Sequence, residues 1–373
     1  MYDSKHEKKG IESLKKGARN YITSYIKKYS NKLNKKKRVT SANSSPAERF
    51  SVCKNNKIQI NSPDTSPFFV EEDKFNLALK EPEPSPLNDY PSTCKFSNPD
   101  PTVIMASTLR DLVFILNKYK SKDIGMFRAA KKSKSFIVIE KEIASLRTED
   151  FFGESRTLAS EEKLLFFINL RNFLVLYGLC KSNLKVIPNT QFKWIEFLCS
   201  ISVNLAGLIY TAFEIEHAIL RATMPTPKVH SPYIKDNISY PKYAHIDRKH
   251  AFAYDKKEPL INFALYLPTV SSPPLMVYTP DEIFMQMKKN AGRYLENQVK
   301  AISSATISLP QIFEWYREDF DRGNDKNDLI YFIANCLSQD ESSKLFRLLT
   351  SSVRKDIIYE KYNWNFGYEH NDT

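Results

Sequence analysis

Glycine is scarce in this sequence, with nine residues in a chain of 373. Loops that cradle phosphate groups need glycine, because the backbone must approach the phosphate closely there. The sequence contains neither a Walker A motif nor another glycine-rich loop of that kind, and it lacks the Gly-x-Ser-x-Gly elbow of serine hydrolases. These absences argue against nucleotide chemistry, and we expect no cofactor.

Cysteine is also scarce, and the five residues are widely spaced: Cys53, Cys94, Cys180, Cys199 and Cys336. An odd number without close pairs argues against a disulfide framework and against a zinc ribbon, so we interpret them as reduced thiols. His245, Asp247 and His250 lie near one another, but their spacing suits neither one helical face nor a zincin. We therefore expect no metal site.

Long apolar runs are missing as well. The longest extends from about Leu164 to Leu179 and is interrupted by Asn169, Arg171 and Asn172. No signal-peptide core opens the sequence. The sequence therefore predicts an intracellular protein without a transmembrane segment, cytoplasmic or nuclear and not secreted.

Positive charge is concentrated in residues 1–40, which we call the basic arm. This segment contains 13 Lys or Arg and three acids, whereas the rest of the chain contains 42 bases and 40 acids. Attraction to acidic partners should therefore act through the arm and not through a charged face of the folded domain.

Apolar residues recur in the basic arm at helical spacing: Ile11, Leu14, Ala18, Ile22, Tyr25, Ile26, Tyr29 and Leu33. The pattern is typical of a basic amphipathic helix, which would lie on an anionic membrane surface, occupy a calmodulin-like groove or remain solvated. The run Lys35-Lys-Lys-Arg38 is typical of a nuclear-import or nucleic-acid-binding cluster. Since no recognition fold accompanies it, the expected partners are proteins, an import receptor or an anionic membrane surface, and not a specific nucleic-acid sequence.

The segment 41–101, which we call the proline-rich linker, holds nine of the twenty prolines. Four Ser-Pro steps recur in it, beginning at Ser45, Ser62, Ser66 and Ser85. Such a composition blocks helices and central strands, so the linker is predicted to be disordered. It would serve as an inert spacer or, through phosphorylation, as a switch for the charge of the arm.

Residues 102–370 are predicted to form one domain of the α+β class, mainly helical with a small β-sheet. Apolar periodicity predicts helices at residues 103–120, 131–146, 160–177, 192–203, 211–222, 280–302, 309–320, 327–337 and 341–352. Residues 211–214 and 308–311 have the pattern of capping boxes. Strands are expected at 261–267 and 305–309, and a long surface loop at 225–259.

Several segments of this domain resemble a known family. The residues that carry the likeness are Phe167-Ile-Asn169-Leu-Arg171-Asn172, Asn204-Leu-Ala-Gly207, Ile215-Glu216-His217-Ala-Ile-Leu220-Arg221, Phe263-Ala-Leu265, Ser271-Ser272-Pro273-Pro-Leu-Met-Val-Tyr278 and Tyr362-Asn-Trp364. In order and spacing they resemble the motifs of DUF547, a family of unknown function, over about residues 103–368. The resemblance implies interaction as much as catalysis, because no reaction is established for the family.

The sequence departs from the family pattern at positions where relatives carry reactive groups. Tyr177 stands where many relatives have histidine, and Tyr266 and Ser272 stand where others have cysteine. A thiol nucleophile at either of the last two positions is therefore absent.

Two hypotheses for the function follow from these residues. In the first, which we favour, the polar motif residues form a buried network in a non-catalytic interaction or regulatory module. In the second, the protein is a divergent hydrolase or transferase with His217 as general base, oriented by Glu216, Asn169 or Asn172, and with Ser271 or Ser272 as nucleophile. Neighbouring Glu216 and His217 should point about 100 degrees apart on an α-helix, so we do not expect them to pair.

Removal of residues 1–40 is expected to leave the fold intact and to abolish any enrichment at the nucleus or at a membrane. The truncation removes ten of the twelve net positive charges of the chain. Imaging of the tagged truncated and full-length proteins measures the effect. An unchanged distribution would show that the arm does not localise the protein.

Overall fold

The computed structural model describes residues 85–90, 100–121, 123–148, 158–225, 227, 252–303, 306–321, 328–350 and 356–368. The basic arm, most of the proline-rich linker and most of the 225–259 loop lie outside these residues. The predictions made for those segments, and the group His245, Asp247 and His250, are therefore outside the described part of the chain. Within that part the fold is predominantly helical with two small sheets, as the sequence predicts.

The central element is helix α7 (Ser160–Lys181), which is buried on all sides from Leu164 to Cys180. Its N-cap is Ala159, whose N–H donates to the Glu162 carboxylate at 2.8 Å. By length and composition α7 could cross a membrane, but 94 % of its apolar window is buried inside the domain, as in the core helix of a globular protein.

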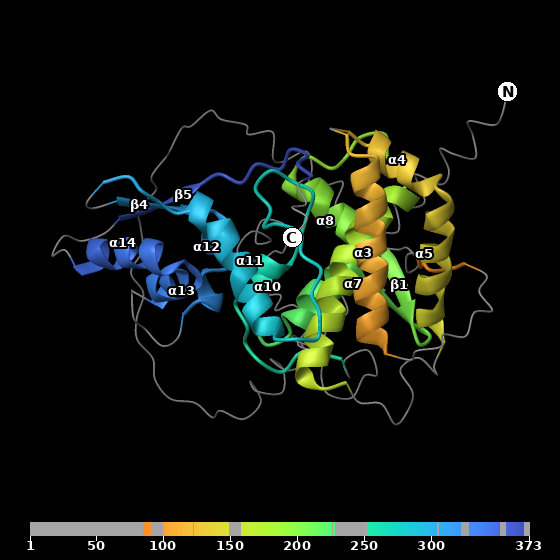
Figure 1. Cartoon of the computed structure of the whole chain (residues 1–373), viewed down its shortest axis with the longest axis horizontal. Coiled ribbons are helices and arrows are strands. Elements are labelled where there is room, and N and C mark those ends of the chain that lie inside the picture. Colours follow the sequence, from red (N-terminus) through yellow and green to blue (C-terminus); the bar gives the residue numbers. More distant parts are fainter. Residues whose placement is uncertain are drawn as a thin grey trace, which may run out of the picture.

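The helices around α7 lie close to the residue ranges predicted from apolar periodicity. Helix α3 (Pro101–Lys118) packs along it, with the Asp100 carboxylate capping the Thr102 N–H. The predicted helix 131–146 is instead α5 (Lys134–Ala144) followed by the 3₁₀ turn η1 (Ser145–Arg147), and a separate helix that was not predicted, α4 (Gly125–Lys131), precedes it. Helix α8 (Gln191–Ser200) covers another side and ends before the first strand. Figure 1 shows α3, α4, α5 and α7 together in one half of the molecule.

After α8 the chain forms a hairpin of β1 (Ser202–Leu205) and β2 (Leu208–Thr211). Its turn contains Ala206 and Gly207, whose φ angles of 49° and 85° are left-handed, and the Gly207 N–H donates to the Asn204 side chain at 2.9 Å. The left-handed conformation explains the glycine of the Asn-Leu-Ala-Gly motif.

A capping box then starts the next helical segment, as predicted, because Thr211 and Glu214 exchange side-chain and backbone bonds. One short α-helical turn, α9 (Ala212–Glu214), leads directly into the π-helix η2 (Ile215–Leu220). The Arg221 N–H donates to the Glu216 carbonyl, five residues back, which is the bond that defines this wide turn. An ordinary α-helix was predicted here.

The predicted strand at 261–267 is wrong. Residues 261–264 form the short helix α10 (Ile261–Ala264), and the chain then continues to Tyr278 through a turn at residues 268–272, outside the two sheets, with one isolated bridge between Thr269 and Phe366. Several of its backbone groups are bonded to asparagine side chains of α7, and residues 268–271 are bonded to the backbone of the C-terminal segment.

A second half of the domain, left in Figure 1, is built on α11 (Ile283–Gln298). Strands β3 (Lys300–Ala301), β4 (Thr306–Pro310) and β5 (Asp356–Glu360) form a sheet in the order β3-β4-β5, in which the second pair is parallel. The remaining elements are α12 (Ile312–Trp315), the 3₁₀ turn η5 (Arg317–Asp319), α13 (Asp328–Cys336) and α14 (Gln339–Thr350). Strand β4 confirms the expected strand at 305–309.

Two details of this half have clear causes. Helices α11 and α13 approach so closely at Gly292 that a Cβ there would lie 2.5 Å from the Cys336 carbonyl oxygen. The capping box predicted at 308–311 is wrong, because Ser308 lies within β4 and the Gln311 side chain accepts the Tyr362 N–H at 2.9 Å. The helix predicted at 309–320 does not form as one piece, because these residues are divided among the end of β4, α12 and η5.

Residues 85–90 pack on the domain, although they belong to the segment that was predicted to be disordered. The Leu87 N–H donates to the Ser202 carbonyl at 2.8 Å. The fully buried Asn88 amide donates to the carbonyls of Ile143 and Asn204 and accepts the Asn204 N–H. Residues upstream of the predicted domain start at 102 thus contact the folded domain.

Replacement of Asn88 by alanine is expected to destabilise the domain by about 1–3 kcal/mol, because three backbone groups that are buried or partly buried lose their partner. The matched control is Asp89→Ala, which removes a surface ion pair of 3.1 Å with Arg147 and should cost less than about 1 kcal/mol. Urea denaturation measures both. Equal stability of the two variants would show that residues 85–90 do not hold the domain.

Candidate functional site

A partly open pocket with a cavity volume of about 80 Å³ lies among α7, α8, η2, α12 and the C-terminal segment. We call it the tryptophan pocket. It is lined by Arg171, Gln191, Trp194, Ile195, Leu198, Glu216, His217, Asn262, Leu265, Leu267, Ser272, Pro273, Ile312, Trp315, Tyr316, Tyr362 and Trp364. Segments from both halves of the domain therefore contribute to one concave surface.

All three tryptophans of the chain line this pocket. Trp194 is buried on α8, whereas Trp315 and Trp364 are partly exposed. The rings of Trp315 and Trp364 stack with centroids 5.6 Å apart, and Tyr362 lies 4.3 Å from Trp364. The pocket thus has an aromatic rim formed by Trp315, Tyr362 and Trp364.

The floor of the pocket holds a buried ion pair. The Arg171 guanidinium on α7 donates to Glu216 Oε2 at 2.6 Å and also to the Tyr266 carbonyl oxygen. The two charged side chains are 3 % and 8 % exposed. Since each charge has an opposite charge beside it, the floor carries no net charge from this pair.

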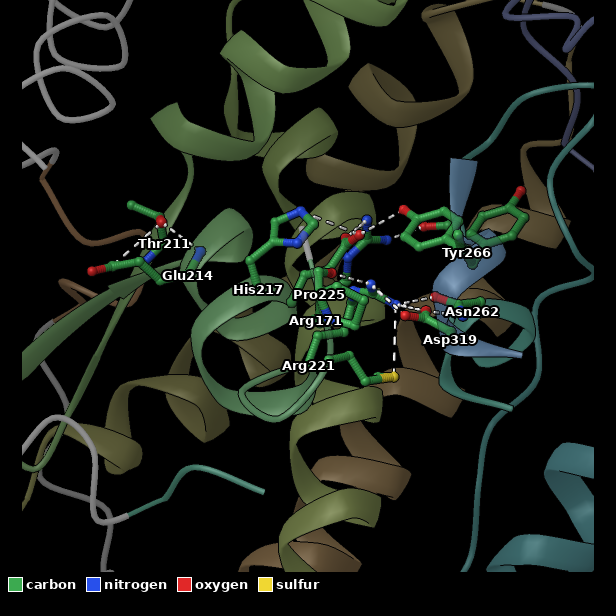
Figure 2. A network of polar contacts seen from close by, with 12 residues as sticks. Arg171, Thr211, Glu214, His217, Arg221, Pro225, Asn262, Tyr266 and Asp319 are labelled. Carbon is green, nitrogen blue, oxygen red and sulfur yellow. Dashed lines mark hydrogen bonds and ion pairs between the residues drawn. The ribbon is translucent and has the colours of Figure 1, made fainter. Parts of the chain in front are cut away.

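His217 lies next to this pair, contrary to the expectation from α-helical geometry. Its Nε2 is 3.5 Å from Glu216 Oε1, and its ring packs against Phe213 with centroids 4.5 Å apart. The segment is a π-helix and not the α-helix on which that expectation was based. Figure 2 shows His217 beside Arg171 and Arg221.

The environment of His217 favours its neutral form. Burial holds the pKa of His217 well below its usual value, and the positive charges of Arg221 and Arg171 lower this pKa further. A neutral imidazole can act as a base or simply fill a polar position in a core, so the lowered pKa fits both hypotheses.

A second buried cluster lies behind the floor. Arg221 makes a two-pronged ion pair with Asp319 and donates to Asn262 Oδ1 at 2.5 Å, while the Asn262 amide donates to Asp319 at 2.7 Å. The Arg221 guanidinium also lies 4.4 Å from the centre of the Tyr316 ring. As Figure 2 shows, the cluster ties η2 to segments from the other half of the domain.

Three asparagines fix the chain between α10 and α11. Asn169 both donates to the Tyr278 carbonyl and accepts the Tyr278 N–H, at 2.8 and 3.0 Å. Asn172 does the same with the Ala264 carbonyl and the Tyr266 N–H, each at 2.9 Å. Asn290 of α11 donates to the Phe263 and Pro274 carbonyls. Asn169 and Asn172 therefore hold the backbone, and their amides do not orient His217.

The serine turn is engaged in structural bonds. Ser272 Oγ accepts the Leu267 N–H at 2.9 Å and donates to the Pro273 carbonyl at 3.1 Å. Ser271 Oγ accepts the Asn363 N–H at 2.9 Å, and Ser271 does not line the pocket. Of the two serines considered as nucleophiles, Ser272 alone is brought to the same pocket as His217.

Neither a reactive thiol nor a metal-binding cluster is found among the described residues. Burial raises the pKa of the thiols of Cys180, Cys199 and Cys336, which keeps them protonated. Within the same residues, no three His, Cys, Asp or Glu side chains are grouped so that they could hold a metal ion.

Sequence reasoning missed several residues of the site: Trp194, Asn262, Trp315, Tyr316 and Asp319. The small number of tryptophans was a usable signal, because rare, large aromatic side chains often mark contact sites. No comparable signal marked Asp319 as the partner of Arg221, since that contact depends on the three-dimensional path of the chain.

Residues 155–295 match the model of a family described as "Protein of unknown function, DUF547". The family resemblance seen in the motifs is confirmed for this segment, which contains α7, the β1–β2 hairpin, η2 and most of α11. Trp315 and Trp364 lie beyond the match, so the rim of the pocket is built outside it. No curated protein and no solved structure matches the chain.

Replacement of His217 by alanine is expected to destabilise the domain by roughly 1–3 kcal/mol, because it opens the buried contact with Glu216 and Phe213. Chemical denaturation of both proteins measures the difference. A variant as stable as wild type would contradict a structural role for His217.

The dependence on pH provides a second measurement for the same residue. Because folding lowers the pKa of His217 from 6.5, the unfolded chain binds the proton more readily. The contribution of neutral His217 to stability is thus complete above pH 6.5 and falls below it by about 1.4 kcal/mol per pH unit. Denaturation between pH 7.5 and 5 should show a shallower loss for His217→Gln than for wild type.

Proposed function

We propose that this domain is a non-catalytic recognition module in which the tryptophan pocket binds an extended peptide segment of a partner protein. The observation that carries the proposal is the convergence of all three tryptophans on one pocket with a partly exposed rim. Function then depends on what this surface binds and on where the basic arm brings it.

The aromatic rim supports binding of a peptide. Trp and Tyr are the residues that most often dominate protein interfaces, since they offer a large apolar face at a small cost in conformational entropy. Trp315 and Trp364 are stacked and held by Tyr362, so their faces are fixed before a ligand arrives. A preorganised surface binds more tightly than one that must be ordered on binding.

The floor supports an uncharged polar ligand group. Arg171 and Glu216 neutralise each other, and the same Arg171 is also bonded to a backbone carbonyl. A ligand carboxylate would meet the Glu216 carboxylate, and a ligand amine would meet Arg171. A peptide carbonyl or N–H avoids both penalties.

Two buried donors of the pocket walls lack an acceptor among the described residues. They are Trp194 Nε1 and Arg171 Nε, and both residues line the pocket. An unsatisfied buried N–H costs about 1–3 kcal/mol. A ligand that brings carbonyl oxygens into the pocket, with a small shift of its walls, would recover part of this cost.

The second candidate function is catalysis, and the observation that favours it is the presence of His217 and Ser272 in the same pocket. Against it stand the bonds of Ser272, whose hydroxyl is directed to the Pro273 carbonyl and so is not offered to a base. The Glu216 carboxylate is likewise engaged in the ion pair with Arg171. The geometry therefore supports recognition better than acyl transfer.

Replacement of Trp364 by alanine in the full chain is expected to weaken peptide binding about thirtyfold, the effect of losing an interfacial hot spot of about 2 kcal/mol. Binding is measured on an array of ten-residue peptides of varied sequence. The control is Phe114→Ala, which removes an aromatic residue of α3 that is 74 % exposed and does not line the pocket.

The two candidate functions give different results in parallel assays. Recognition predicts peptides that bind wild type and Phe114→Ala but not Trp364→Ala. If wild type and Trp364→Ala bind the same peptides equally, the pocket is not the binding site. Hydrolysis of a p-nitrophenyl ester that is lost in Ser272→Ala, with binding unchanged, would favour catalysis.

A further inference from the structure

We infer that the tryptophan pocket selects the primary carboxamide of a glutamine or asparagine side chain in the bound peptide. The inference rests on the proposed function and names the ligand group that enters the cavity beneath the aromatic rim. Three observations carry it: the small volume of the cavity, the N–H donors of Arg171 and Trp194, and the acceptor oxygen of Glu216.

The cavity volume of about 80 Å³ limits the size of the group that can enter. A water molecule occupies about 30 Å³ in the liquid, so the cavity corresponds to about two or three waters. A carboxamide consists of one carbon, one oxygen and one nitrogen atom and fits a space of this size. One side-chain end therefore enters the cavity, while the rest of the peptide lies on the rim.

Two buried N–H groups of the cavity walls select for an acceptor. Trp194 Nε1 and Arg171 Nε have no hydrogen-bond partner among the described residues, and the two residues are 1 % and 2 % exposed. Both residues line the cavity. A buried N–H without a partner is costly, so a ligand oxygen that accepts from either group gains free energy that an apolar side chain does not.

The Glu216 carboxylate next to Arg171 selects for a donor. Its Oε2 accepts the 2.6 Å bond from Arg171 Nη2. Its Oε1 lies 3.5 Å from the Tyr316 hydroxyl and 3.5 Å from His217 Nε2, both at the long limit of a hydrogen bond. Since Nε and Nη2 belong to one planar guanidinium group, an oxygen that accepts from Nε lies close to this carboxylate. The ligand must therefore offer an acceptor and a donor side by side.

A primary carboxamide offers both from one end of a side chain, with its oxygen as acceptor and its NH₂ group as donor. A backbone amide does not, because the carbonyl and the N–H of a trans peptide point in opposite directions. A ligand carboxylate lacks a donor and would meet Glu216, and an ammonium group lacks an acceptor and would meet Arg171. Glutamine and asparagine side chains avoid all three mismatches.

The test uses the full-length protein, immobilised, and libraries of ten-residue peptides. Each library has one fixed residue at its fifth position, which is Gln, Asn, Glu, Met or Ser, and an equimolar mixture without Gln and Asn elsewhere. The retained fraction of each library is quantified by mass spectrometry. We expect the Gln or the Asn library to be retained about tenfold more strongly than the Glu, Met and Ser libraries, a difference of about 1.4 kcal/mol.

The variant Trp194→Phe removes one of the two donors and keeps an aromatic ring. It should lower the preference for the carboxamide library over the Met library from about tenfold to about threefold, because one hydrogen bond to the ligand is lost. A purely structural role of Trp194 would lower the retention of all libraries by the same factor. The control is Lys193→Gln, an exposed neighbour on α8 that does not line the pocket and should retain the full preference.

Equal retention of all five libraries by wild type, lost in Trp364→Ala, would overturn the carboxamide preference and leave the proposed function standing. Strongest retention of the Ser, Glu or Met library would overturn it as well, and so would a tenfold preference that persists in Trp194→Phe. If no library is retained, both the proposed function and this inference are wrong. Should Trp194→Phe not fold, the ratios measured with wild type decide alone.

Discussion

Two side-chain amides on the central helix hold most of this structure in register. Asn169 and Asn172 lie on either side of Arg171 in a fully buried, mostly apolar stretch of α7, and each forms a pair of bonds with the backbone of the chain between α10 and α11. Without them, buried backbone groups of that chain would lack partners and the segment would not stay against α7. Its position in turn sets the Tyr266 carbonyl, which orients Arg171, and the Pro273 turn, which forms one wall of the pocket.

The ion pairs extend this arrangement from one half of the domain to the other. Arg171 joins α7 to η2 through Glu216, and Arg221 joins η2 to the segment of Asp319. Buried pairs of this kind add little net stability, but the loss of one partner is costly because a charge is left alone in the interior. The pocket between the halves is therefore stiff at its floor, whereas its rim of partly exposed aromatic rings remains accessible.

The sequence was informative where structure follows from local pattern. Apolar periodicity located α3, α7, α8, α11, α13 and α14, and the capping pattern at Thr211 and Glu214 was correct. The strand predicted at 261–267 was wrong. Residues 261–264 are the buried helix α10, and the Tyr266 N–H after it bonds to the Asn172 side chain and not to a neighbouring strand. The convergence of Trp194, Trp315 and Trp364 could not be predicted, since residues so far apart in sequence meet only through the path of the whole chain.

The π-helix η2 makes the site depend on chain length as well as on residue identity. A π turn contains one residue more than the α-helical turn it replaces. Loss of a single residue from Ile215–Leu220 would restore α-helical hydrogen bonding and rotate every side chain on one side of the gap relative to the other. Glu216 and Arg221 could then no longer both face their present partners. Among related sequences, an insertion or deletion in these six positions should therefore mark a different floor even where every motif residue is retained.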